Sequence, residues 1–230
     1  MATRKRRSKK GALWLLAMFV IGAGLILLAL TQTFSVEQLG DAAKREMTVA
    51  SIQRATQKSK QQPDAFNYAK TAQLNPLTVG GYGLRELTGR SSYGAVGQVR
   101  VPAVGLDLPI GIGVSNSVLV RGAGTLKADQ RMGQGNYALA GHYMTPRRLL
   151  FSPLEGVRKG NAVYLTDKRQ VYHYRVTRVR MIDRHQVSVI NDVPGQKLVT
   201  LVTCASAKRG EPKRLVVQGE LQSVRPATTA

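Results

Sequence analysis

The distribution of apolar residues divides the chain into segments of different character. Residues 12–30 form an apolar run without charge, residues 32–75 are polar with sparse apolar positions, and from about residue 97 short apolar runs alternate with turn residues. A helix over the 19 residues of the first run spans about 28 Å, close to the thickness of a bilayer core. We therefore expect a basic tail, a transmembrane helix, a polar and partly helical stalk, and a folded domain, at residues 1–11, 12–31, 32–95 and 96–230.

Seven short runs in the folded domain have the composition of β-strands. They cover residues 98–104, 106–113, 137–143, 162–166, 171–182, 197–204 and 214–221. Only two short helices are expected, at 115–122 and 148–156, which leaves no room for the crossover helices of a parallel α/β fold. The pattern predicts an all-β domain, either a closed barrel or a sandwich.

The residues flanking the apolar run predict its orientation. Residues 1–10 contain six basic residues and no acidic one, whereas Glu37 and Asp41 are the acidic residues just after the run. The positive-inside rule then places the N-terminus in the cytoplasm and residues 32–230 outside the cell. A cleaved signal peptide is the competing interpretation, but its apolar region is normally shorter and ends in a small-x-small site, unlike Leu30-Thr31-Gln32. We favour a retained single-pass anchor in the cell membrane.

Composition narrows the possible partners. The chain has 34 Lys and Arg against 13 Asp and Glu, a formal charge of +21, and only the basic tail concentrates that charge. The remaining charge is diffuse, as on a solvated surface or one attracted to anionic envelope polymers. Nucleic-acid binding is disfavoured because no reading helix or zinc finger is visible and the domain is expected outside the membrane. A single cysteine excludes an intramolecular disulfide framework.

That cysteine, Cys204, is the first candidate for chemistry. It ends the expected strand 197–204, and a period of two places Thr200 and Val202 on its face. Cations favour a thiolate, the nucleophilic form of cysteine. The following loop and strand supply Lys208, Arg209, Lys213 and Arg214. From these residues alone, a structural cysteine and a catalytic cysteine are equally supported.

A cysteine nucleophile needs a proton donor for its leaving group, and the chain has three histidines. His142 follows a short apolar strand and a glycine, in Ala140-Gly141-His142. His173 lies within a strand between two tyrosines, which is typical of a packed or surface position. His185 lies in a polar stretch typical of a solvated loop. The position of His142 in the sequence therefore favours it over the other two histidines as the proton donor.

Three segments resemble the sortase family. Thr200–Cys204, TLVTC, is similar to the T-L-x-T-C signature of sortases, Ala140-Gly141-His142 resembles the segment with their catalytic histidine, and Arg214 matches their arginine. The resemblance covers roughly residues 95–222 and extends to the N-terminal anchor. It favours class A, the housekeeping type of Gram-positive bacteria, because residues 64–66 lack the proline of the lid motif found in pilin-polymerising sortases and the C-terminus is polar.

The resemblance implies a fold, a reaction and three catalytic roles. The fold would be a closed eight-stranded sortase-type β-barrel with short helices, its missing strand near residues 187–190. The reaction would be cleavage of a Leu-Pro-x-Thr-Gly (LPxTG) sorting signal between Thr and Gly, then transfer to the amine of a peptidoglycan precursor, lipid II. Cys204 would be the nucleophile, His142 the general acid and base, and Arg214 the group that stabilises the oxyanion or binds substrate.

The resemblance also implies a substrate groove. Ala140, Thr200 and Val202 would line it, with Thr203 as a supporting neighbour, and Val187, Val189 and Ile190 would form an apolar pocket for the Leu-Pro end. Some class A sortases bind calcium through acidic residues between strands, but residues 116–135 offer only Asp129. High-affinity calcium sites usually need several carboxylates, so we expect neither a metal nor a cofactor.

Two other functions stay open from the sequence. One is an anchored, non-catalytic β-domain that binds anionic wall polymers. The other is a cysteine peptidase with the same catalytic residues and water as acceptor. A binding domain would tolerate loss of the Cys204 thiol, whereas neither a transpeptidase nor a cysteine peptidase would.

Overall fold

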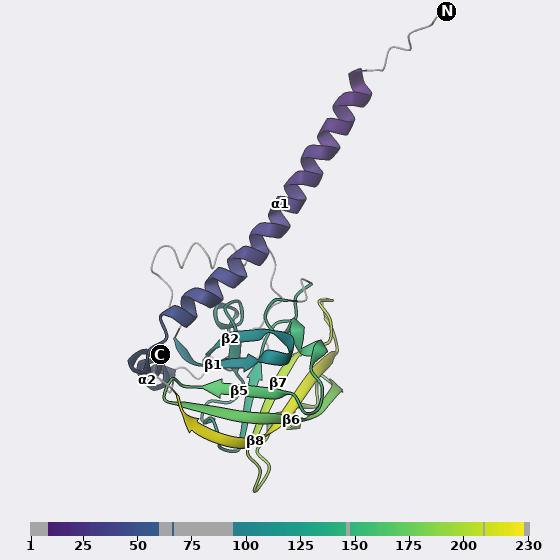
Figure 1. Ribbon diagram of the computed structural model, residues 1–230. Helices are drawn as coiled ribbons and strands as arrows, with labels where there is room; N and C mark the ends of the chain where they lie inside the picture. Colours follow the sequence, from purple (N-terminus) through teal and green to yellow (C-terminus); the bar gives the residue numbers. More distant parts are fainter. Residues whose placement is uncertain (1–8, 60–65, 67–93, 146–147, 209, 228–230) are drawn as a thin grey trace, which may run out of the picture.

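The computed structural model describes residues 9–59, 66, 94–145, 148–208 and 210–227. Within them, eight strands close into a mixed β-barrel (Figure 1). Around the barrel the strands follow the order β1 (Ala95–Val101), β2 (Leu106–Gly111), β3 (Ala123–Thr125), β4 (Asn136–Ala140), β7 (Leu198–Cys204), β8 (Lys213–Pro226), β6 (Gln170–Asp183) and β5 (Ala162–Thr166). The β2–β3 and β4–β7 pairs are parallel, and the remaining pairs are antiparallel. The predicted barrel is confirmed, and the sandwich is excluded.

The alternation of side chains along each strand explains the core. In β7, Val199 and Leu201 are fully buried in the main hydrophobic cluster inside the barrel. Val202 and Cys204 face the other side and are only half-buried. Because successive strand residues point to opposite faces, the face that carries Cys204 is the outer face of the barrel wall.

All seven predicted strands form: the run at 162–166 has the same bounds as β5, and the other six have shifted ends. The largest change is in β8, which continues to Pro226 instead of ending at residue 221. The first predicted strand ends early, because Pro102 has no N–H for a ladder and begins the 3-10 helix η3 (Pro102–Val104). The expected helices shorten to α4 (Asn116–Leu119) and the 3-10 helix η4 (Ser152–Gly156).

The position predicted for the eighth strand is wrong. Val187–Ile190 forms a 3-10 helix, η5, between β6 and β7. The eighth strand is β3, with only three residues, parallel to β2 and antiparallel to β4. A three-residue strand rich in Ala and Gly has no alternation to detect, and it exists because its two neighbours pair with it.

The N-terminal part of the chain forms two helices, α1 (Lys9–Arg45) and α2 (Val49–Ser59), and α1 extends away from the barrel (Figure 1). The predicted span at residues 12–31 falls inside α1, although the side chains of 9–13 and 25–35 lie outside the described residues. No helix in the described part of the chain combines the length and apolar character needed to cross a membrane.

The N-terminal part of the predicted stalk packs on the barrel. Val36 and Leu39 of α1 are buried against the barrel, and Ile52 of α2 is buried with Met47 and Ala95. The sparse apolar residues of this polar segment therefore serve as packing contacts. Residues 60–65 and 67–93 of the predicted stalk lie outside the described residues.

Candidate active site

Cys204 and Arg214 face each other at the ends of adjacent strands. They are directly paired in the antiparallel β7–β8 ladder, so both side chains leave the sheet on its outer face. The guanidinium Nη1 of Arg214 donates hydrogen bonds to the carbonyl oxygens of Glu211 (2.6 Å) and Lys213 (3.0 Å). These bonds hold the guanidinium at the start of β8, where Arg214 is paired with Cys204. Of the predicted neighbouring cations, Arg209 lies outside the described residues.

The parallel β4–β7 pair brings His142 to the same edge. Ala140 at the end of β4 pairs with Val202, two residues before Cys204, and His142 lies two residues beyond Ala140. The turn at Gly141 is held by β7: the Gly141 N–H donates to the Val202 carbonyl (3.1 Å) and the Thr203 hydroxyl donates to the Gly141 carbonyl (2.8 Å). A Cβ on Gly141 would lie 2.4 Å from the Phe151 ring, so only glycine fits.

A cavity of about 610 Å³ on the outer face brings these three residues together. Its floor is the ends of β4, β7 and β8, and its opposite wall includes η5 and the residues between β2 and β4. The predicted residues that line it are Ala140, His142, Val187, Val189, Ile190, Val202, Thr203, Cys204 and Arg214. A concave, mainly apolar cavity with a few polar groups is the usual form of a ligand site.

Thr200 is the one predicted groove residue that the cavity does not include. It is fully buried, donates to the Asn136 amide oxygen (2.7 Å) and accepts from Gln218 Nε2 (3.2 Å). Thr200 lies on the same face of β7 as Cys204, as the alternation predicts, but η5 covers that part of the face. Thr200 thus belongs to the support of the cavity.

Burial shifts the pKa values of the thiol and the imidazole in opposite directions. Desolvation lowers the pKa of His142 to about 4. His142 is half-buried as a residue, and its Nε2 is buried and has no hydrogen-bond partner among the described residues. Desolvation raises the pKa of Cys204, the positive charge of Arg214 lowers it, and the negative charge of Glu211 raises it further. The free cavity therefore favours a neutral thiol beside a neutral imidazole.

We expect removal of the Arg214 charge and removal of the Glu211 charge to shift the pKa of Cys204 in opposite directions. Arg214→Gln removes a charge that lowers the Cys204 pKa, so the thiol will ionise at higher pH; Glu211→Gln removes a charge that raises it, so the thiol will ionise at lower pH. The measurement is the pH dependence of alkylation of Cys204 by iodoacetamide. A shift of both variants in the same direction would contradict this electrostatic arrangement.

The sequence did not single out the residues that hold η5 over the cavity. The Asp192 carboxylate accepts from Lys127 Nζ (2.5 Å) and from the Asn136 N–H (2.7 Å). The Asn136 amide nitrogen in turn donates to the carbonyls of Val189 (3.0 Å) and Asn191 (3.1 Å). The Asn191-Asp192 pair marks a turn in the sequence, but nothing in the sequence predicts its partners Lys127 and Asn136, which are more than 50 residues away along the chain.

We expect Asp192→Ala to loosen this wall of the cavity. Loss of a charge-assisted bond to Asn136 and of a half-exposed ion pair should raise the KM for a substrate peptide by about three- to tenfold, with a smaller change in kcat. Steady-state kinetics would measure this. Asp167→Ala is the matched control, since Asp167 accepts from Arg169 and Gln170 in the β5–β6 turn, away from η5; an unchanged KM in Asp192→Ala would contradict the role.

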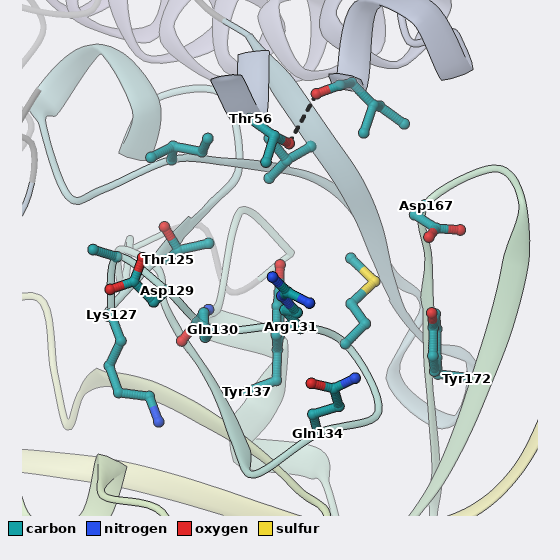
Figure 2. A pocket seen from close by; sticks show the side chains of 15 residues that line it. Thr56, Thr125, Lys127, Asp129, Gln130, Arg131, Gln134, Tyr137, Asp167 and Tyr172 are labelled. Atoms are coloured by element: carbon teal, nitrogen blue, oxygen red, sulfur yellow. Dashed lines mark hydrogen bonds between the residues drawn. The ribbon is translucent and has the colours of Figure 1, made fainter. Parts of the chain in front are cut away.

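The other two histidines lie outside this cavity. His173 stacks on Tyr164 with ring centroids 4.9 Å apart, and His185 is exposed. A second cavity, of about 480 Å³, lies between α2 and the β3–β4 connection and contains none of the three predicted catalytic residues (Figure 2). Its labelled side chains include Thr56 of α2, Arg131 and Tyr172.

The barrel and its cavity define a class, a β-barrel protein with a strand-end cysteine, a histidine and an arginine on one outer face. The sortase domain family matches residues 99–222, which is more than half of the chain. The chain is 33% identical to sortase A of Streptococcus agalactiae serotype III over 94% of its length and 87% of that protein. It is 34% identical to sortase A of Listeria monocytogenes over 79% of each chain.

The structures agree with this match. The crystal structure of sortase A from Listeria monocytogenes superposes with a TM-score of 0.57 at 40% identity, covering 59% of this chain and 92% of that one. The chain belongs to the sortase family and is a cysteine transpeptidase, as the resemblance of the three segments predicted.

Proposed function

We propose that this transpeptidase cleaves an LPxTG-type sorting signal between Thr and Gly and transfers the protein to the amine of lipid II. Surface proteins would thereby be attached to the cell wall. The observation that carries the proposal is the common cavity of Cys204, His142 and Arg214, in a chain whose relatives are named sortase A. Hydrolysis, with water as acceptor, would use the same residues and differs only in product.

In the proposed acylation step, the Cys204 thiolate attacks the carbonyl carbon of the Thr–Gly bond. Arg214 donates hydrogen bonds to the oxyanion or to the substrate backbone, for which its planar, always charged guanidinium is suited. His142, as imidazolium, gives its proton to the leaving glycine nitrogen, and the C–N bond breaks to leave a thioacyl enzyme. In the second step the amine attacks the thioester, His142 takes its proton, and the thiolate leaves.

The proposed protonation state is the minor one in the free cavity. A thiolate–imidazolium pair has the same net charge as the neutral pair, so its fraction is constant between the two pKa values and the pH profile belongs to the pair. Substrate that fills the cavity brings amide dipoles next to both groups. The transpeptidation rate should therefore fall at low pH, where the thiol stays protonated while His142 is charged, and at high pH, where His142 has no proton to give.

The apolar part of the cavity suits the Leu-Pro end of the signal. Val187, Val189 and Ile190 belong to η5, and Ala140 and Val202 line the cavity from the strand ends. We assign the Leu-Pro end to η5 and the Thr–Gly bond to the strand ends. Residues 12–31 would anchor the chain, with residues 1–11 in the cytoplasm and the domain at 96–230 outside.

The experiment uses the full chain in detergent micelles with a Leu-Pro-Glu-Thr-Gly peptide and a short oligoglycine or diamine. Mass spectrometry of the products should give the peptide cut after Thr and joined to the amine. A peptide with scrambled order is the control. Cleavage with water as the only acceptor would replace the proposal by hydrolysis, and no reaction with several signals and amines from folded protein would overturn it.

A further inference from the structure

The last turns of α1 have one apolar face, and that face packs on the barrel. Val36 is 3% exposed and Leu39 is 5% exposed, while Glu37 and Gln38 between them are exposed. The spacing of three residues places Val36 and Leu39 on the same side of the helix. Their buried partners are Val120, Leu149 and Leu150, with Leu108 and Met144 alongside.

Leu149, Leu150 and Met144 belong to residues 142–145 and 148–152, which are the described part of the chain after His142 and are here called the His142 loop. Contacts between its two parts hold the His142 loop together. Tyr143 and Leu150 form a β-bridge, and the Phe151 N–H donates to the His142 carbonyl (3.0 Å). The Ser152 hydroxyl accepts from the Met144 N–H (2.7 Å) and donates to the Met144 carbonyl (3.1 Å).

The loop depends on packing to keep this shape. Leu150 has φ of 51°, a left-handed conformation that is unfavourable for residues other than glycine and persists only where surrounding structure holds it. Leu150 is 3% exposed and lies in the cluster that α1 covers. Removing the α1 side chains would uncover a strained residue two positions from the end of the loop.

His142 itself has little else to orient its ring. Its Nε2 is buried and unpaired among the described residues, so no hydrogen bond at that atom fixes the imidazole. The place of the ring in the cavity therefore depends on the His142 backbone, which β7 fixes on one side through Gly141 and the His142 loop fixes on the other. One of these two supports rests on α1.

We propose that α1 is a positioning element of the active site, and that Val36 and Leu39 act through the His142 loop to hold the imidazole in the Cys204 cavity. The proposal rests on the proposed role of His142. Because α1 is one unbroken helix from Lys9 to Arg45, the residues predicted to span the membrane and those that support the loop belong to the same rigid rod. A helix contact at the membrane-proximal side of the barrel thereby becomes part of the catalytic apparatus.

The test compares Val36→Ala/Leu39→Ala with Ile52→Ala in the full chain in detergent micelles. Ile52 is 8% exposed and also buries an aliphatic side chain of the N-terminal helices, but its cluster contains Met47 and Ala95 and no part of the His142 loop. We expect about a tenfold fall in kcat for the double variant, less than a twofold change in KM, and neither change in Ile52→Ala. The single variant Leu39→Met, which keeps Val36 and nearly the same buried volume, should have the wild-type kcat.

A second readout separates positioning from general destabilisation. If the loop loosens, water reaches the imidazole and the His142 pKa rises from about 4 toward its ordinary value. Titration of the imidazole protons by NMR, assigned with a His142 variant, should show that rise in Val36→Ala/Leu39→Ala alone. Wild-type kcat and an unchanged His142 titration in the folded double variant would overturn the proposal, and so would equal losses in Ile52→Ala.

The two proposals fail in different ways. If the proposed function is wrong, the wild-type chain will join no sorting peptide to an amine, and the NMR titration still tests the contact between α1 and the loop. If the positioning proposal is wrong, the wild-type chain will be active and the double variant will match it in both measurements.

Discussion

Cys204→Ala will abolish transpeptidation, with a loss on the order of 10⁴-fold or more, while the barrel stays folded. The reason is that Cys204 is the only cysteine in the chain and lines the cavity together with His142 and Arg214. Cys204 is half-buried at the end of β7, so removing its sulfur costs about 1 kcal/mol or less in the free energy of unfolding. The measurements are product formation by mass spectrometry and thermal unfolding of both proteins.

The thioacyl intermediate provides a direct check of the nucleophile. Acid quenching of the wild-type chain with sorting peptide and no amine should trap a mass increase of the acyl fragment on the peptide that contains Cys204. Cys204→Ser, which keeps a weaker nucleophile in the same place, should show no more than a trace of that increase. Full transpeptidation activity in either variant would contradict the assignment of Cys204 as the nucleophile.

His142→Ala will lower kcat/KM by about 10²- to 10⁴-fold, the usual contribution of a positioned general acid and base. Without the imidazolium, the leaving glycine amine must depart unprotonated or take its proton from water. The Cys204 thiol will still react with iodoacetamide, because alkylation needs no proton donor. Steady-state kinetics and alkylation rates on the same protein therefore separate loss of the acid from loss of the nucleophile.

The other histidines supply matched controls for this prediction. His173→Ala removes a ring that stacks on Tyr164, and His185→Ala removes an exposed one; neither lines the Cys204 cavity. Both variants should keep activity within about twofold of wild type. Activity of His142→Ala within the same range would reject the assigned role, and added imidazole should partly restore the rate if the assignment is right.

The catalytic arrangement follows from the sheet order. A parallel pair, β4–β7, and an antiparallel pair, β7–β8, share the central strand. The end of β4, the end of β7 and the start of β8 therefore lie at one edge of the barrel wall. Three residues from distant parts of the sequence reach one cavity without any long loop, which suits chemistry that needs fixed geometry.

The sequence predicted much of the fold because strand signals are local. The alternation in Thr200–Cys204 placed Thr200, Val202 and Cys204 on one face of a strand that ends at Cys204, and both features agree with the structure. It failed at residues 187–190, where a β-branched run forms η5, and at β3, where three small residues form a strand. In both places partners far along the chain outweigh local propensity.

The sequence by itself determined the apolar N-terminal run, the strand-rich domain, the single cysteine, and the three segments that identify the family. Only the tertiary structure decided which groups share a cavity, that Thr200 supports it from beneath, and that α1 packs on the His142 loop. The direction in which the pKa of His142 shifts also follows from the tertiary structure. The low pKa of His142 comes from burial by segments scattered along the chain, and desolvation is a property of that assembled surrounding and of no local stretch of sequence.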